Sequence, residues 1–360
     1  MKRLIITLTL AVVLLVALAT PAGAASATSL SPSTLTTFSP GLYGAFAAGM
    51  AADSHGSLFS SLTTWGLYDD TVNPPLLGPN IGQIWKVAPN GHKRLVATKD
   101  LTPYGMLLGV AVDADDHVYV ALVGGGTPPA IDSAVLRLGR HGKLTEVVKL
   151  PDGAFPNSLA FHDGRLYITD SILGAVWRVR LTHGVSTPAA PWLQDTLLAP
   201  GDPATDSTAM GLGANGIAFR GERLFVSVSD YGRIVRIYVR DDGSPGAPRV
   251  ICKRLKLKTA DGIAFDARGR LWIATNAGTK GASPSGGLYR LSKTWKLRTI
   301  ADDPGWLNYP TMPVFGTTAA TATRLYVENG AYWGFSDKTA PSIVRVRVGV
   351  PGLPLFQEAP

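Results

Sequence analysis

The sequence predicts an all-β protein, a six-bladed β-propeller with four-stranded antiparallel blades. Three observations lead to this prediction: a segment that recurs six times, a strand-type alternation inside each copy, and a composition rich in turn residues. The 360 residues include 40 Gly and 26 Pro, and 46% are hydrophobic, which favours a large packed core over disorder. Only 17% are charged, which argues against a coiled coil.

The recurring segment is clearest at its second predicted strand, which begins with an apolar residue followed by an aromatic one. The six copies have a mean spacing of about 53 residues, and a fixed period of this order indicates a repeat architecture. The pairs are Leu58-Phe59, Val118-Tyr119, Leu166-Tyr167, Leu224-Phe225, Leu271-Trp272 and Leu325-Tyr326.

Most copies also contain other strands of a blade. A preceding strand recurs, as in NSLAFHDGRLYIT at 157–169 and NGIAFRGERLFVS at 215–227. A third strand follows with alternating basic and apolar residues, and a fourth is predicted at 143–150 and 296–300. Alternation with period two indicates half-buried strands, and the Asp/Gly turns between them indicate hairpins. Four short antiparallel strands per copy are typical of a propeller.

The chain divides into four parts. Residues 1–24 have the features of a secretory signal peptide: Lys2 and Arg3, an apolar run over 4–19, and A-x-A sites that place cleavage after residue 24 or as late as 27. Residues 25–44 form an N-terminal segment that is a candidate to close the ring, 45–350 form the propeller, and 351–360 form a C-terminal tail. The apolar run is shorter than the about 20 residues of a membrane span, so we expect a secreted protein without a membrane anchor after cleavage.

Charge and cysteine content exclude several classes of site and partner. The single Cys252 excludes a disulfide framework and a Cys-based zinc site. The formal net charge is +8, but the basic residues are dispersed and no block of five or six like charges occurs, so nucleic-acid binding is not expected. A monomer that binds a small molecule is the expected state.

The first strands of a propeller line its central channel, so equivalent positions near their starts form a ring. The predicted ring consists of Ala48, Leu108, Asn157, Asn215, Asp261 and Thr311. Three of these, Asn157, Asn215 and Asp261, offer only oxygen ligands, which suit a hard divalent cation and calcium best. The alternative is that Asn215-Gly216 and Asp261-Gly262 are ordinary turn residues.

The ends of the second strands supply a neighbouring set of polar residues. Asp170 and Asp230 are the candidate catalytic groups, with capping of the following loop as the alternative role. Thr311, Asn276 and Asn329 are the predicted substrate-pocket residues. The loops at 61–81, 122–133, 199–213 and 276–286 are predicted to wall that pocket. Six aromatic residues are expected to line the pocket, with packing in the core or between blades as their alternative role. They are Trp65, Tyr68, Tyr104, Trp306, Tyr309 and Trp333.

PNSLAF at 156–161, ANGIAF followed by LFVSVSD at 214–230, and ADGIAFDARGRLWIA at 260–274 resemble the gluconolactonase/regucalcin family and its relatives, the paraoxonases and strictosidine synthases. The resemblance covers about 45–350. It implies that Asn215 and Asp261 are metal ligands, that Asn157 is a ligand or substrate contact, and that the ion polarises the substrate carbonyl.

This sequence departs from the family pattern at two positions. Ala48 stands where the hydrolytic families supply an acidic ligand from the first blade, and Leu108 stands where paraoxonases have a histidine. Despite these departures, the resemblance implies a divalent-metal-assisted lactonase or esterase that acts on a small molecule, and the signal peptide implies that it is secreted. The alternatives are a non-catalytic ligand- or glycan-binding propeller that lacks the full metal site, and a metal-free synthase.

Overall fold

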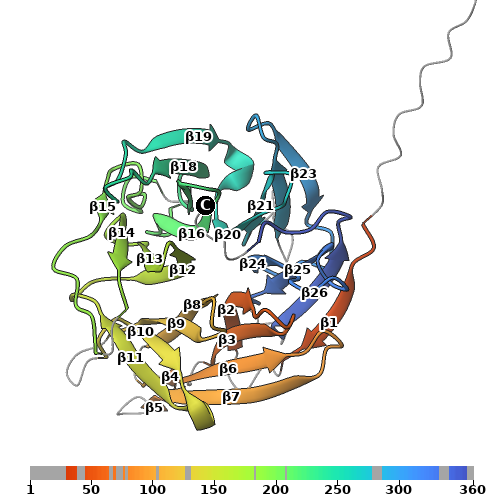
Figure 1. Cartoon of the computed structure of the whole chain (residues 1–360), viewed down its shortest axis with the longest axis horizontal. Helices are drawn as coiled ribbons and strands as arrows, with labels where there is room; N and C mark the ends of the chain where they lie inside the picture. Colours follow the sequence, from red (N-terminus) through yellow and green to blue (C-terminus); the bar gives the residue numbers. More distant parts are fainter. Residues whose placement is uncertain are drawn as a thin grey trace, which may run out of the picture. The chain divides into compact units, whose positions relative to one another are not determined.

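The computed structural model describes residues 30–38, 45–64, 68–69, 76–77, 80–102, 105–125, 131–181, 184–206, 209–277, 286–331 and 340–354. The predicted signal peptide and the aromatic residues Trp65, Tyr104 and Trp333 lie outside these residues. The compact unit Ser31–Pro360 contains, in its described part, six four-stranded antiparallel sheets arranged around an axis (Figure 1). The predicted six-bladed β-propeller is confirmed.

Each blade runs from an inner strand outward, and blades 1 to 6 follow chain order. The inner strands are β2 (Ala45–Ala52), β8 (Met106–Val112), β12 (Pro156–His162), β16 (Ala214–Phe219), β20 (Ala260–Phe265) and β24 (Pro310–Phe315). The second strands are β3 (Leu58–Thr64), β9 (Val118–Val123), β13 (Arg165–Asp170), β17 (Arg223–Val228), β21 (Leu271–Thr275) and β25 (Arg324–Asn329).

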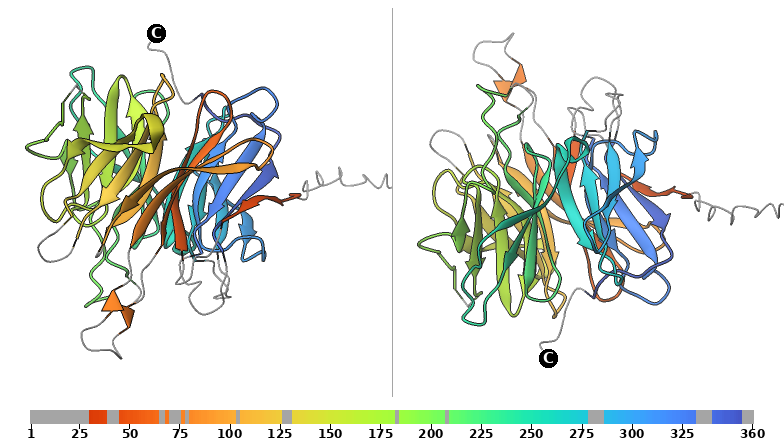
Figure 2. Two further views of the ribbon diagram at one scale, coloured as in Figure 1. Left: turned by 90° about the horizontal axis from the view of Figure 1, so that it is seen from below. Right: turned by 90° about the horizontal axis from the view of Figure 1, so that it is seen from above.

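The two outer strands of each blade complete the sheets. The third strands are β6 (Ile81–Val87), β10 (Ala134–Leu138), β14 (Ala175–Val179), β18 (Arg233–Tyr238), β22 (Gly287–Leu291) and β26 (Ser342–Arg347). The outermost strands are β7 (Lys93–Asp100), β11 (Leu144–Lys149), β15 (Leu193–Gln194), β19 (Arg249–Lys253), β23 (Leu297–Asp302) and β1 (Ser33–Thr37). A two-stranded sheet, β4 (Tyr68–Asp69) with β5 (Leu76–Leu77), projects from one face (Figure 2). Short 3-10 turns occur at Arg140–Gly142 and Leu255–Leu257.

The N-terminal strand β1 completes the last blade. It pairs antiparallel with β26, with Ser33 opposite Arg345 and Thr37 opposite Ser342. Since β1 precedes blade 1 in the sequence but is hydrogen-bonded in blade 6, it joins the two ends of the ring. This closure covers the outer edge of blade 6, which would otherwise expose unpaired backbone groups.

The aromatic residue of each second strand faces the basic residue of the third strand at the same register in all six described blades. The pairs are Phe59–Lys86, Tyr119–Arg137, Tyr167–Arg178, Phe225–Arg236, Trp272–Arg290 and Tyr326–Arg345. Lys86 Nζ lies 5.0 Å from the ring centre of Phe59, and Arg290 Cζ lies 5.2 Å from that of Trp272. In these two pairs the contact is a cross-strand cation–π interaction, and in all six pairs the shared register places the basic residue opposite the aromatic one.

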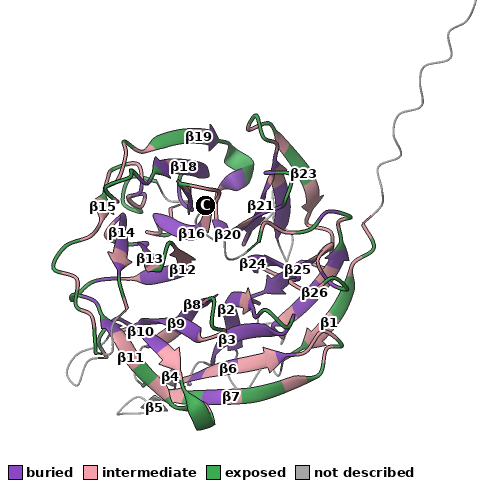
Figure 3. Cartoon of the chain, viewed as in Figure 1, coloured by how far each residue is buried: buried purple, intermediate pink, exposed green. Residues whose placement is uncertain are grey.

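The inner strands of neighbouring blades pack so closely that a side chain cannot fit between them at one repeated position. Figure 3 shows the inner strands mostly buried, whereas residues of the outermost strands are mostly intermediate or exposed. A Cβ atom on Gly216 would lie 2.2 Å from the carbonyl oxygen of Asp261, and one on Gly109 would lie 2.3 Å from that of Asn157. Gly216 lies within β16, and its backbone is not in the left-handed region. Glycine is therefore required for close backbone approach, and the turn interpretation of Asn215-Gly216 is wrong.

In the part of the chain that the structure describes, no helix has both the length and the apolar character of a membrane span.

We predict that Gly216→Ala destabilises the propeller by about 1–3 kcal/mol, because the added methyl group has to displace the backbone of the next blade. Chemical denaturation monitored by tryptophan fluorescence measures this change. Gly184→Ala is the matched control, since a Cβ atom at Gly184 meets nothing within 4 Å. Equal stability of the two variants would contradict the close-approach explanation.

Candidate functional site

Every inner strand carries a β-bulge at its predicted ring position. The register of the inner strand with the second strand shifts between Ala47 and Gly49 in blade 1 and between Ala214 and Ile217 in blade 4. The other four blades show the same shift at Leu107/Val110, Pro156/Leu159, Ala260/Ile263 and Pro310/Pro313. Bulges redirect side chains and are common beside active sites. The predicted ring positions are therefore structurally equivalent.

A set of side chains, which we call the inter-blade belt, connects each of blades 1 to 5 to the main chain of the next. Each member donates a hydrogen bond to a carbonyl oxygen at or near the start of the next inner strand. Ser171 Oγ donates to Ala214 O (2.7 Å) and Ser229 Oγ donates to Ala260 O (2.7 Å). The other members are Ser61, Ser133, Thr169, Ser227 and Asn276, whose acceptors are Leu108 O, Ala154 O, Asn215 O, Asp261 O and Pro310 O.

The belt fixes which way the amides of Asn157 and Asn215 point. Asn157 lies 3.0 Å from Ser171 Oγ, and Asn215 lies 3.0 Å from Ser229 Oγ. A serine hydroxyl has one hydrogen, and each of these serines donates it to the next blade. Each serine therefore accepts a hydrogen bond from the amide Nδ2, so the amide oxygen points away from the belt. Asn215 Oδ1 is buried and has no hydrogen-bond partner among the described residues, which marks it as available to a ligand.

In blade 5 the ring residue is a carboxylate, Asp261, and its belt partner is Asn276. Asp261 accepts a hydrogen bond at Oδ2 from Asn276 Nδ2 (2.8 Å), and the same Nδ2 donates to Pro310 O (3.1 Å). A carboxylate cannot donate, so its belt partner has to donate one hydrogen bond to Asp261 and another to Pro310 O. An amide NH₂ group has the two hydrogens that this requires, whereas a serine hydroxyl has one. Burial raises the pKa of Asp261 to about 7, although hydrogen bonds from Asn276 and the Gly262 N–H act in the opposite direction. Asn276, predicted to line a substrate pocket, thus holds Asp261 in place.

Asp170 is fully buried and its carboxylate is occupied by the protein itself. Oδ1 accepts hydrogen bonds from the N–H groups of Phe155, Ile172 and Leu173, and Oδ2 accepts one from Trp177 Nε1 (3.0 Å). These contacts close the turn between β13 and β14. They favour the capping role over the catalytic role.

Asp230 has the same kind of environment in blade 4. Oδ1 accepts a hydrogen bond from Met210 N–H (2.8 Å), and Oδ2 accepts from Gly201 N–H (3.0 Å) and Leu212 N–H (2.8 Å). The carboxylate therefore fixes the loop that leads into β16. The catalytic prediction for Asp230 has no support from these contacts.

Thr311 contacts a carboxylate that lies beside the predicted ring. Thr311 Oγ1 donates to Glu328 Oε2 (3.0 Å), and Ser60 Oγ donates to Glu328 Oε1. Burial raises the pKa of Glu328 to about 8, helped by the negative charge of Asp261, whereas the two hydroxyl donors lower it. Asn329 points elsewhere: its side chain bonds Asn308 N–H, Trp306 O and Ser342 Oγ. The structure thus groups Thr311 with Glu328 and uses Asn329 to fix the segment before β24.

A cavity of about 560 Å³ occupies the opposite end of the channel. Its lining comes from the inner strands beyond the ring positions and from the hairpins that follow them, and it includes Phe161, Phe219, Phe265 and Phe315. The ring residues lie near the starts of the same strands. The predicted pocket over the ring is therefore not this cavity. Of its predicted aromatic walls, Trp306 packs against the core beside Trp272 and Phe315.

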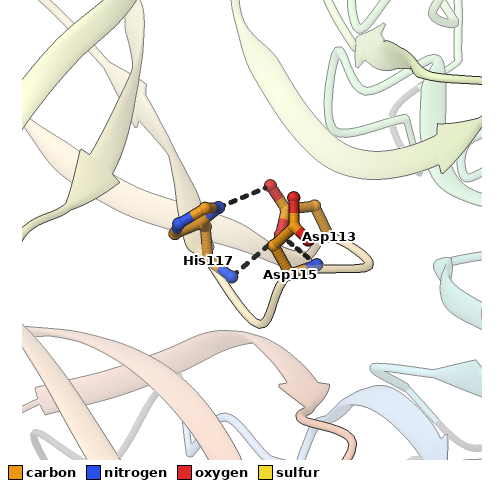
Figure 4. A group of neighbouring side chains, drawn as sticks. All are labelled: Asp113, Asp115 and His117. Atoms are coloured by element: carbon orange, nitrogen blue, oxygen red, sulfur yellow. Dashed lines mark hydrogen bonds and ion pairs between the residues drawn. The ribbon is translucent and has the colours of Figure 1, made fainter.

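Asp113, Asp115 and His117 form a second group of metal-ligand types, at the hairpin between β8 and β9 (Figure 4). Asp113 Oδ1 accepts hydrogen bonds from the N–H groups of Asp115 (3.0 Å) and His117 (2.8 Å), and Oδ2 lies 3.1 Å from His117 Nδ1. Asp53 and Asp266 close the corresponding hairpins of blades 1 and 5 through the same pattern of N–H donors. Asp113 therefore has a structural role that repeats between blades.

The chain is similar to solved structures along most of its length. One is a protein provisionally assigned as a gluconolactonase, with 15% identity, a TM-score of 0.57, and coverage of 91% of this chain and 94% of that one. A gluconolactonase from Xanthomonas campestris has 17% identity, a TM-score of 0.53, and coverage of 89% and 90%. These proteins share one fold. The PQQ-bound aldose sugar dehydrogenase from Streptomyces coelicolor shares it too, with 17% identity, a TM-score of 0.53, and coverage of 88% and 98%.

No family model matches the sequence, and no curated protein matches it. The likeness to gluconolactonase-like structures therefore concerns the six-bladed propeller, and the chemistry has to be argued from the residues of this chain.

Sequence reasoning missed the belt serines, although the sequence contains a signal for them. Ser171 follows Asn157 by 14 residues, and Ser229 follows Asn215 by the same 14. The interval to Asn276 from Asp261 is 15 residues. A polar partner 14 or 15 residues after each of the three oxygen-bearing ring residues indicates a paired role within the blade.

We predict that the metal-free protein, held in EDTA, loses stability as the pH rises from about 4 to about 8. Asp261 and Glu328 have pKa values of about 7 and about 8 in the folded chain, above the ordinary values of 3.8 and 4.5 that apply to the unfolded chain. The unfolded chain therefore releases these protons at lower pH than the folded chain does, and the stabilisation is lost as the pH rises through the folded values.

Thermal unfolding across this pH range measures the effect, with the double variant Asp261→Asn/Glu328→Gln as the reference. The stability of the variant relative to wild type should rise with pH. A constant difference would show that the two carboxyl groups do not titrate as a buried pair.

Proposed function

We propose that this protein is a secreted hydrolase that opens lactones or related esters of small molecules with the help of a divalent metal ion, Ca²⁺. The observation that carries the proposal is the orientation of the ring. The belt turns the amide oxygens of Asn157 and Asn215 away from the serines, and among the described residues Asn215 Oδ1 has no partner. Asn215 lies on the blade before the one that contains the buried carboxylate of Asp261. Oxygen-only donor sets of this kind suit hard cations.

The burial and hydrogen bonding of these residues favour a bound cation over a polar cluster that holds none. Asn215 Oδ1 lacks a partner within the described residues, and leaving a buried acceptor unsatisfied costs about 1–3 kcal/mol. Asp261 is 5% exposed and forms no ion pair with a described cationic side chain. A bound cation would satisfy the amide oxygen and neutralise the carboxylate together.

When bound, such an ion supplies Lewis-acid chemistry, because it polarises an ester carbonyl and lowers the pKa of water. The residues of the chain prepare the site for it. Ser171 and Ser229 hold the two amides, and Asn276 fixes one oxygen of Asp261. The other oxygen of Asp261 and the amide oxygens would hold the ion, and the ion would keep this carboxylate in its charged form.

The remaining parts of the proposal come from the sequence. The basic pair Lys2 and Arg3, the apolar run over 4–19 and the A-x-A sites support export and cleavage of the leader. The dispersed basic residues argue against a nucleic-acid partner, and a monomer that acts on a small molecule completes the proposal.

We predict that Ser229→Ala weakens Ca²⁺ binding by about 10–100-fold, the usual effect of removing a partner that orients a metal ligand. Without the serine, the Asn215 amide is free to rotate away from the site. Isothermal titration calorimetry measures the affinity. Ser133→Ala is the matched control, because Ser133 makes the same belt bond to Ala154 O but holds no predicted ligand. A similar loss in both variants would show that the effect comes from the belt as a whole.

We predict that the purified protein with Ca²⁺ hydrolyses γ- or δ-lactones or p-nitrophenyl acetate, and that Asp261→Asn lowers kcat/KM by at least about 100-fold, because the variant loses the charged ligand of the ion that would polarise the ester carbonyl. Glu222→Gln is the control, since this carboxylate is 55% exposed and belongs to a surface pair with His162. A wild-type protein that binds Ca²⁺ but hydrolyses none of these substrates would favour the ligand-binding alternative.

A further inference from the structure

Glu328 occupies the belt position of blade 6. It is the fourth residue of the repeat that begins at Leu325, where blades 1, 3 and 4 have Ser61, Thr169 and Ser227. Each of these hydroxyl residues donates to the main chain of the ring residue of the following blade. Because the ring closes, the blade that follows blade 6 is blade 1, whose ring residue is Ala48.

The contacts of Glu328 agree with this placement. Its Oε1 accepts a hydrogen bond from Ser60 of blade 1, and its Oε2 accepts one from Thr311 of its own blade. The main chains also meet there, since Ala47 N–H donates to Gly330 O (3.2 Å). The Glu328 carboxylate therefore lies at the junction of blades 6 and 1, beside the position that Ala48 leaves without a functional group.

The environment of Glu328 is poor for a charge in the absence of a cation. The residue is fully buried and is hydrogen-bonded by two neutral hydroxyl groups, and no cationic side chain forms an ion pair with it in the described part of the chain. The nearby negative charge of Asp261 in blade 5 makes ionisation harder. A buried carboxylate without a counter-charge is costly, and two of them near one channel end are costlier still.

A second observation also indicates a ligand. Asn215 Oδ1 is buried and unpartnered among the described residues, and Asn215 itself is 2% exposed. The main chains of Gly216 and Asp261 are in close contact, so Asn215 lies on the blade adjacent to Asp261. Blades 4, 5 and 6 thus bring an unused amide oxygen and two buried carboxyl groups to the same end of the channel.

We propose that Glu328 is a carboxylate ligand of the metal ion and supplies from blade 6 the acidic group that Ala48 does not supply from blade 1. This inference rests on the proposed metal site. With Glu328 and Asp261 together, two formal negative charges face the divalent ion in place of one, and a higher ligand charge strengthens Ca²⁺ binding. Ser60 and Thr311 are positioning residues that hold the carboxylate at the blade junction.

Calorimetric titration of the full purified chain with CaCl₂ at pH 7.5 tests this assignment. Wild type should bind one Ca²⁺, and Glu328→Gln should weaken binding by about 100-fold or more. Loss of a residue that only hydrogen-bonds a metal ligand already weakens binding by about 10–100-fold, and loss of a charged ligand should cost no less. Glu222→Gln should bind as wild type does. Glu328→Asp, which keeps the charge on a shorter side chain, should recover part of the affinity.

Thermal unfolding provides a readout independent of activity. In EDTA, Glu328→Gln should melt at the same temperature as wild type or higher, because the substitution removes a buried charge near Asp261. Addition of Ca²⁺ should raise the melting temperature of wild type more than that of the variant. A variant that melts lower in EDTA and keeps the full Ca²⁺ shift would overturn the assignment in favour of a purely structural role.

The outcomes separate this inference from the proposed function. If wild type and Glu328→Gln bind Ca²⁺ equally while Asp261→Asn does not, Glu328 is not a ligand and the proposed metal site stands. If wild type binds neither Ca²⁺ nor another divalent ion, both proposals fail.

Discussion

In blades 1, 2, 4 and 5 the residue after the ring position is a glycine, and the next inner strand lies so close that no space is left there for a Cβ atom. The carbonyl oxygen of Asp261 occupies the place where a side chain on residue 216 would begin, and the same holds for Gly109 against Asn157. This backbone-to-backbone contact makes the belt possible, because a single hydroxyl side chain spans the distance to the next blade. The contact therefore determines both the packing of the blades and the orientation of the polar ring.

The direction of the hydrogen bonds between blades determines which atoms of the ring residues face the candidate site. A belt serine has one hydrogen, and in blades 3 and 4 the next blade receives it. The neighbouring asparagine therefore presents its NH₂ group to the serine and its oxygen elsewhere. Blade 5 reverses both partners, since Asp261 accepts and Asn276 donates. Stability and site geometry thus depend on the same bonds, which explains how a site can be rigid without disulfides.

Burial of carboxyl groups has two different outcomes in this molecule. Asp170 and Asp230 are buried with three or more N–H donors each, and they hold turns and loops. Asp261 and Glu328 are buried with fewer donors and close enough for the charge of one to affect the other. The first arrangement satisfies the charge within the protein. In the second arrangement the charge of each carboxylate has to be neutralised by a bound cation or by a proton. This difference distinguishes the structural aspartates from the candidate site residues.

Sequence alone determined the number of blades, the strands and the ring positions, because each depends on a pattern that repeats at a regular interval. Period-two alternation predicted the strands, and the register of pairs such as Trp272–Arg290 confirmed the alignment of the copies. The same sequence left the roles of Asp170 and Asp230 open, because capping and catalysis use the same residue types in the same places.

Tertiary structure decided what depends on contacts between blades. It gave Gly216 a packing role, oriented the amides of Asn157 and Asn215, and brought Glu328 of blade 6 against Ser60 of blade 1 across 268 residues of sequence. A repeat pattern describes each blade separately and contains no information on which atoms of adjacent blades touch. Closure of the ring creates those contacts, and the candidate site consists of them.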